Sequence, residues 1–100
     1  MPLAAPGSTT GEVFGTRAYA VGVTVPAAGE LARNTDEVIR LRHAAAAAGI
    51  GSFEVEDNQG DLSITIFFDS RRRRDAEAAA GRFVALAGLR GAVVGMPQRV

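Results

Sequence analysis

Alternating apolar and polar residues over positions 52–69 predict two strands joined by a tight turn. A period of two is typical of a strand with one buried face. The segment between the strands, Asp-Asn-Gln-Gly at positions 57–60, contains residues that tolerate turn conformations. The apolar positions of the two strands are Phe53, Val55, Leu62, Ile64, Ile66 and Phe68.

These apolar positions also predict how the two strands pair. Pairing Val55 with Leu62, and Phe53 with Ile64, places the large side chains on one face, and a slip of one residue divides that face. An even-length loop then joins the strands, closed by one of two pairs: Glu56 with Asp61, or Asp57 with Gly60.

Two further strands are expected. Residues 16–25 alternate between large side chains at Tyr19, Val21, Val23 and Val25 and small ones between them, and Pro26 ends the strand because it has no amide hydrogen. Residues 91–96 predict a short last strand closed by Pro97. The connection over residues 26–34 has no clear pattern, although Leu31 fits the apolar stripe of the helix that follows.

The first helix is expected over residues 35–48. Asn34 or Thr35 can cap it, Asp36 and Arg40 have the spacing of an ion pair, and Gly49 is a natural C-terminal cap. Its inward stripe is expected to consist of Val38, Leu41, Ala45 and Ala48.

A second helix is expected to start after a cap at Asp69 or Ser70 and to reach Ala87, with Gly88 ending it. Its inward stripe is mostly alanine, which allows the helix to lie close to a sheet. The stripe is Ala76, Ala79, Ala80, Phe83 and Ala87.

The predicted order is β-α-β-β-α-β, an α+β domain. The simplest packing for this order is the ferredoxin-like split β-α-β sandwich, a four-stranded antiparallel sheet with two helices on one face and strand order 4-1-3-2. Residues 16–100 are expected to form this single domain. Residues 1–15, rich in Pro, Gly, Ser and Thr, are expected to be a flexible N-terminal arm.

Composition limits the possible environments and sites. The chain has 100 residues and no cysteine, which excludes disulfides and thiolate metal sites. No apolar run approaches the roughly 20 residues of a membrane span, and the N-terminus lacks the pattern of a secretory signal. We therefore expect a cytoplasmic protein that does not associate with membranes.

Charge is unevenly distributed along a chain of zero net charge. Residues 1–70 hold four Arg and nine acids, giving −5, and residues 71–100 hold seven Arg and two acids, giving +5. A molecule with two oppositely charged parts can associate with copies of itself.

An arginine run is the most unusual motif. It is expected in the first turn of the second helix, where the helix dipole already favours anions, so a phosphate-like ligand is one interpretation. The other is a solvated helix end or protein contact, because consecutive helical residues point in different directions and Asp75 and Glu77 partly neutralise the cluster. The run consists of Arg71, Arg72, Arg73 and Arg74.

The sheet face opposite the helices is expected to carry small uncharged residues. RNA binding by such a face needs several aromatic side chains, and only Phe67 is present, so nucleic-acid binding is not favoured. Packing against another sheet suits this face better. The expected oligomer interface is Ala18, Ala20, Gly22, Thr24, Ser63, Thr65 and Phe67.

The sequence shows no set of residues typical of a catalytic or metal site. His43 is expected to be exposed, and the acids at the hairpin tip lack the spacing of a calcium loop. No nucleophile, base and orienting group can be assembled, so we favour a non-catalytic protein without a cofactor. The acids at the tip are Glu54, Glu56, Asp57 and Asp61.

Two main functional hypotheses follow. The first is a self-associating interaction module, a structural subunit of a larger protein assembly, whose partner is itself or another protein. The second is a small-ligand or anion-binding domain, regulatory or enzymatic, that uses the arginine run and a cleft near the connection over residues 26–34. Nucleic-acid binding through the same arginines is a third hypothesis.

Overall fold

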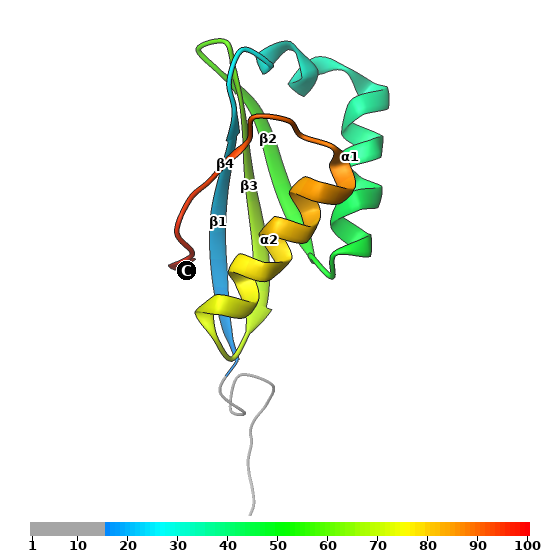
Figure 1. Cartoon of the computed structure of the whole chain (residues 1–100). Helices are drawn as coiled ribbons and strands as arrows, with labels where there is room; N and C mark the ends of the chain where they lie inside the picture. Colours follow the sequence, from blue (N-terminus) through cyan, green and yellow to red (C-terminus); the bar gives the residue numbers. More distant parts are fainter. Residues whose placement is uncertain (1–15) are drawn as a thin grey trace, which may run out of the picture.

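An antiparallel sheet with two helices on one face makes up the chain over residues 16–100, the part that the computed structural model describes (Figure 1). The predicted arm, residues 1–15, lies outside the described residues. The elements in order are β1 (Arg17–Val25), the 3-10 helix η3 (Gly29–Arg33), α1 (Thr35–Ala47), β2 (Ser52–Asn58), β3 (Asp61–Ser70), α2 (Arg73–Ala87), β4 (Val93–Val94) and β5 (Gln98–Arg99).

The strands are arranged in the order β2-β3-β1-β4, and β5 also pairs with β1. All pairings are antiparallel, and the two central strands pair over their whole common length, from Arg17 opposite Ser70 to Val25 opposite Leu62. The predicted α+β class, with an antiparallel sheet and two helices, is confirmed.

The alternation in the sequence correctly predicts the buried face of the two central strands. Val21, Ile64 and Ile66 have no exposed surface, whereas the residues between them in each strand are partly or fully exposed. The core residues of these strands are Tyr19, Val21, Val23, Val25, Leu62, Ile64 and Ile66.

Helix α1 forms largely where the sequence predicts it. The Asn34 side chain accepts a hydrogen bond from the Glu37 amide at 3.2 Å, so Asn34 is the cap, and Gly49 follows the helix with φ of 80°. The predicted pairing of Asp36 with Arg40 is wrong: Arg40 binds Glu37 instead, at 2.8 Å, one turn away.

Helix α2 begins later than predicted. Strand β3 continues through Ser70, so Asp69 and Ser70 do not cap the helix, and Arg72 occupies the N-cap position without a side-chain cap. The Ser70 hydroxyl instead accepts a hydrogen bond from the Arg72 amide at 3.2 Å and donates one to Asp75 at 2.9 Å. These bonds turn the chain from the sheet into the helix.

The predicted hairpin register is wrong by two residues, although the buried face is correct. Val55 lies opposite Ile64, and the loop has two residues, Gln59 and Gly60, with φ of 55° and 92°. Two successive positive φ values match a tight two-residue hairpin turn. A shift by an even number of residues keeps every side chain on its face, so the alternation could not distinguish the two registers. Phe53 lies opposite Ile66.

The predicted last strand over residues 91–96 is correct only in part. β4 covers two of these residues, Val93 and Val94, and a second short strand, β5, follows beyond Pro97. The Gly95 amide donates to the Gly22 carbonyl at 2.8 Å, and Pro97, which has no amide hydrogen, interrupts the ladder. Pairing with β1 resumes beyond it, where the Val100 amide donates to the Ala18 carbonyl at 2.9 Å. The C-terminal segment therefore returns along β1 (Figure 1).

Both helices pack on the buried face through mainly small side chains. The C-terminal end of each helix is also bound by an arginine of the other helix. Arg40 of α1 donates to the Ala87 carbonyl, and Arg82 of α2 donates to the Ala48 carbonyl at 3.2 Å. The helix residues in the core are Leu41, Ala44, Ala45, Ala76, Ala79, Ala80, Phe83 and Ala87.

Truncating buried side chains of the central strand β3 should destabilise the protein strongly. Ile64→Ala and Ile66→Ala each remove a fully buried side chain, and we expect each to lower the free energy of unfolding by about 2 to 5 kcal/mol in urea denaturation. Glu56→Ala, at an exposed position of the same sheet, is the control and should change it by less than about 0.5 kcal/mol. If both isoleucine variants lowered the free energy of unfolding by less than about 0.5 kcal/mol, the assignment of these residues to the core would be wrong.

Candidate interaction surfaces

The sheet face opposite the helices is the first candidate surface. We call the seven residues predicted for it the open face: Ala18, Ala20, Gly22, Thr24, Ser63, Thr65 and Phe67. The structure places them together, because Ala20 lies opposite Phe67, Gly22 opposite Thr65 and Thr24 opposite Ser63. Ala18, Gly22 and Thr24 are exposed, and the other four are partly exposed.

The rest of this side of the sheet is less uniform than the sequence predicts. On β2, Glu54 lies opposite Thr65 and Glu56 opposite Ser63, so the outer strand brings two carboxylates beside the open face. On the other side, Val93 of β4 lies opposite Thr24 and is 62% exposed. Sequence reasoning missed Val93 because it did not fix the register of the last strand.

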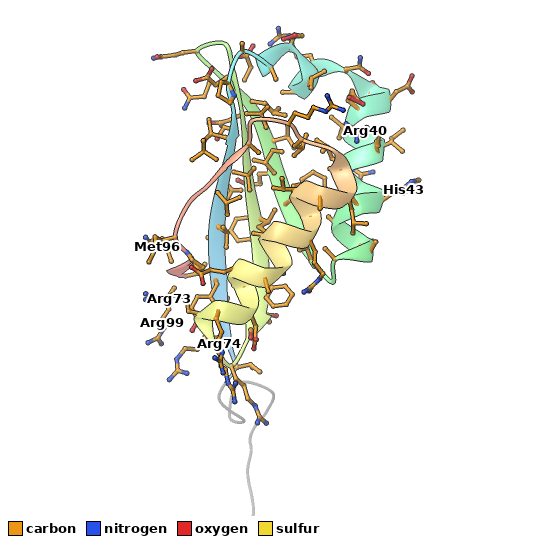
Figure 2. The ribbon with its side chains drawn as sticks, in the orientation of Figure 1. Arg40, His43, Arg73, Arg74, Met96 and Arg99 are labelled. Carbon is orange, nitrogen blue, oxygen red and sulfur yellow. The ribbon has the colours of Figure 1, made fainter. Side chains whose placement is uncertain are left out.

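The arginine run is the second candidate surface, and the structure divides it. Arg71 and Arg72 precede α2, and only Arg73 and Arg74 lie in its first turn. The prediction that all four lie in the first turn is wrong, because β3 is longer than expected. Figure 2 shows Arg73, Arg74 and Arg99 at the same end of the molecule, where β5 ends near the start of β1.

The N-terminal end of α2 already has an anion of its own. Asp75 lies in the first turn and accepts the hydrogen bond from the Ser70 hydroxyl, which places a carboxylate near the positive end of the helix. All four arginines of the run are exposed. These observations favour a solvated end or a protein contact over a specific anion site.

The acidic hairpin tip has a structural role that the sequence did not indicate. Arg33 donates to Asp57 at 2.6 Å, and the other oxygen of Asp57 accepts from the Gly60 amide at 2.9 Å. Asp61 accepts from the Ala27 amide at 2.9 Å. The tip of the hairpin is therefore bound to the connection between β1 and α1.

A close approach of two backbones completes this contact. We use the name tip clamp for the whole contact between the hairpin tip, residues 57–61, and the connection, residues 27–33. The Gly29 amide donates to the Gly60 carbonyl at 2.9 Å, and a side chain at Gly29 would meet both Asp57 and the backbone carbon of Gly60, the latter at 2.8 Å. The hydrogen bond from Arg33 lowers the pKa of Asp57, and the bond from the Gly60 amide acts in the same direction.

The ionisable groups show no arrangement typical of a metal site. His43 is exposed on α1 and points away from the sheet, as predicted for a surface residue (Figure 2). Within residues 16–100, no three His, Asp or Glu side chains come together in a group able to hold a metal ion. In the same range, no helix has both the length and the apolar character that crossing a membrane requires.

A groove beside β2 is the third candidate surface. It includes Ala32 of the connection over residues 26–34, near which a cleft is expected, but its walls on α1 and β2 were not predicted. It lies between α1 and β2 and has a volume of about 480 Å³. An adjoining hollow of about 320 Å³ shares Ala32, Val38 and Arg42 with it. The groove is lined by Ala32, Val38, Arg42, Ala45, Ala46, Ile50, Gly51, Ser52, Phe53 and Val55.

Comparison with known proteins supports the fold and leaves the function open. No protein-family model matches the chain. No curated protein sequence matches it. A solved chain described as an unknown protein from Galdieria sulphuraria is similar in structure, with a TM-score of 0.53 and 14% sequence identity. The match covers 85% of this chain and 45% of that one, so this chain spans less than half of the solved chain.

The arginines at the start of α2 should be dispensable for folding. We expect Arg73→Gln/Arg74→Gln to leave the melting temperature unchanged or slightly higher at low salt, because it relieves repulsion from the helix dipole. Arg90→Gln, at an exposed arginine after the helix, is the matched control. If the melting temperature of the double variant fell by about 5 °C, which is roughly 1 kcal/mol of stability for a chain of this size, these side chains would stabilise the fold.

The tip clamp should make stability depend on acid pH through Asp57. Because folding lowers the pKa of Asp57, its ionised form stabilises the fold at neutral pH, and this contribution is lost as the pH falls below about 4. Asp57→Asn should therefore be less stable than the wild type at neutral pH, and the difference in urea midpoint should narrow in acid.

Glu56→Gln, which changes an exposed acid of the same strand, is the control and should keep the wild-type urea midpoint at neutral pH. A constant difference between Asp57→Asn and the wild type from neutral pH to about pH 2 would contradict the contribution assigned to the Arg33 contact.

Proposed function

We propose that this chain is a non-catalytic interaction module that self-associates by stacking its open face on that of a second copy. The observation that carries the proposal is the chemistry of the open face. Over the two central strands it presents small, uncharged side chains and Phe67, all at least partly exposed. The charged side chains on this side of the sheet lie around the open face. They are Glu54, Glu56, Asp61 and Asp69.

The area of the sheet is slightly below the usual range for a stable dimer. β1 and β3 are roughly 30 Å long, β2 is about 23 Å long, and β4 and β5 have two residues each. At a spacing of about 4.8 Å the sheet therefore covers roughly 480 Å² per copy, or slightly under about 1,000 Å² for two. Specific interfaces commonly bury about 1,200 to 2,000 Å². We therefore expect a dimer that dissociates in the micromolar range.

Charge favours one orientation of the two copies. The hairpin tip carries Glu56 and Asp61, and the opposite end of the sheet carries Arg71 and Arg72, about 30 Å away along β3. A two-fold axis that runs between the two sheets, parallel to their planes and perpendicular to the strands, stacks the acidic end of one copy over the basic end of its partner. An axis along the strands brings like charges together, so the first arrangement is favoured.

The same proposal includes the finer fold assignment. Counted from the β4 edge, the strands follow the order β4-β1-β3-β2, which is the order of a ferredoxin-like split β-α-β sandwich. The broken last strand, with β5 as an additional pairing on β1, is a departure from the regular arrangement. Cytoplasmic residence and a place in a larger assembly remain predictions.

Anion binding at the arginine run is less well supported. The carboxylate of Asp75 lies in the first turn of α2, where a bound anion would compete with it. Two of the four arginines also lie outside the helix. We therefore assign these residues to the basic end that faces a second copy.

Replacing Phe67 by glutamate should separate the two copies. Phe67→Glu places a charge in the middle of the stacked faces, and we expect a monomer in analytical ultracentrifugation at tens of micromolar, where the wild type is a dimer. Circular dichroism checks that the variant is folded. Ala47→Glu, at an exposed position of α1, is the matched control and should remain dimeric.

Salt provides an independent test of the proposed orientation. Raising the salt concentration from about 0.05 M to 0.5 M should weaken a dimer in which oppositely charged ends are stacked. A monomeric wild type at tens of micromolar, or a Phe67→Glu variant that assembles like the wild type, would overturn the proposal.

A further inference from the structure

Within residues 16–100, strand β2 lies at the edge of the sheet. Among the described strands it pairs only with β3, and the 3-10 helix η3 contacts it at its C-terminal end, where Arg33 binds Asp57. Its seven residues extend over about 23 Å. Such an edge presents unpaired backbone donors and acceptors, and an extended segment of another chain can pair with them.

The groove lies directly along this edge, on the helix side of the sheet. Phe53 and Val55 form one wall, and residues of α1 form the other. Its volume of about 480 Å³ lies within the usual range for binding sites, about 300 to 1,000 Å³. A strand added to β2 would point alternate side chains into this groove, and apolar side chains fit its lining.

The remaining side chains of an added strand would lie on the other side of the sheet. There they meet Glu54 and Glu56, which are both exposed at the edge. Opposite charges on neighbouring strands are favourable, so basic residues suit these positions. Arg42 lines the groove on the helix side and disfavours basic residues there. An added strand is therefore expected to carry basic side chains on the side of Glu54 and Glu56 and apolar side chains on the side of the groove.

These observations specify an occupant. We propose that the β2 edge and its groove bind an extended peptide segment in which apolar residues alternate with lysine or arginine. The apolar residues occupy the groove beside Phe53 and Val55, and the basic residues pair with Glu54 and Glu56. The backbone of the peptide completes the hydrogen bonding of β2 and extends the sheet by one strand.

A second copy of the same strand is a poor occupant of this edge. In an antiparallel pair centred on Val55, Glu54 of each copy lies opposite Glu56 of the other, which places like charges together. The same carboxylates that attract a basic segment thus oppose pairing between two β2 strands. The peptide pairs with the edge of β2, whereas the proposed dimer stacks on the open face, and Glu56 contributes charge to both.

The binding test uses the whole chain and a synthetic peptide as the probe. The peptide is Lys-Val-Lys-Val-Lys-Val-Lys with a fluorescent label, and its affinity is measured by fluorescence anisotropy. We expect saturable binding below about 1 mM and amide shifts in NMR spectra that concentrate in β2. A peptide with glutamate at every lysine position, and one with proline at the central valine, should each bind at least about tenfold more weakly.

Two variants test the two sides of the strand separately. Glu54→Lys/Glu56→Lys should reverse the preference, so that the glutamate peptide binds more tightly than the lysine peptide. Ala46→Trp fills the groove from an exposed position of α1 and should weaken binding by about fivefold or more. Ala47→Trp is the matched control, because Ala47 is also exposed and does not line the groove.

Several results would overturn the inference. These are no binding at about 1 mM, equal affinity for the lysine and glutamate peptides, or amide shifts outside β2 and α1. Concentration-dependent protection of the β2 amides without peptide would assign the edge to a second copy instead. Phe67→Glu should still bind the peptide, so failure of the proposed dimer and failure of this site are distinguishable.

Discussion

The structure depends on the pairing of β1 with β3. These strands run antiparallel over nine residue pairs, and their alternation collects every large aliphatic side chain on one face. Burial of that face is the main source of stability that the sequence supplies. The alanine-rich surfaces of α1 and α2 let both helices approach it closely, and Phe83 fills the remaining space, with its ring centroid 6.2 Å from that of Phe53.

Contacts at the two ends of the sheet keep the connections in place. At one end, the tip clamp joins the hairpin to the segment before α1 through Asp57 and Asp61. At the other end, the hydroxyl of Ser70, the last residue of β3, is hydrogen-bonded to the Arg72 amide and to Asp75 in the first turn of α2. The acids at the tip therefore position a loop, and the clamp explains why a glycine is needed at position 29, where the two backbones meet.

The surfaces left over by this packing suggest how the protein binds others. Because the helices cover one side of the sheet, the open face is available for stacking, and because β2 is an outer strand, its edge is available for strand addition. The acidic end is at the hairpin tip and the basic end is at the start of α2, so charge would orient the partner in each of the two proposed complexes.

The sequence by itself determined the buried face of the central strands, most of the buried helix positions and the order of the main elements, but not the burial of Ala44, Ile50 and Leu89. Alternation in β1 and β3 and the alanine stripes of the helices depend on local periodicity, which is readable without a structure. The register of β2 and β3, the start of α2 and the division of the last strand were decided by the tertiary structure. A two-residue shift leaves the alternation unchanged, and the hydrogen bonds that fix Ser70, Asp57 and Gly95 join residues whose proximity no local pattern encodes. The groove likewise exists only because α1 lies beside β2.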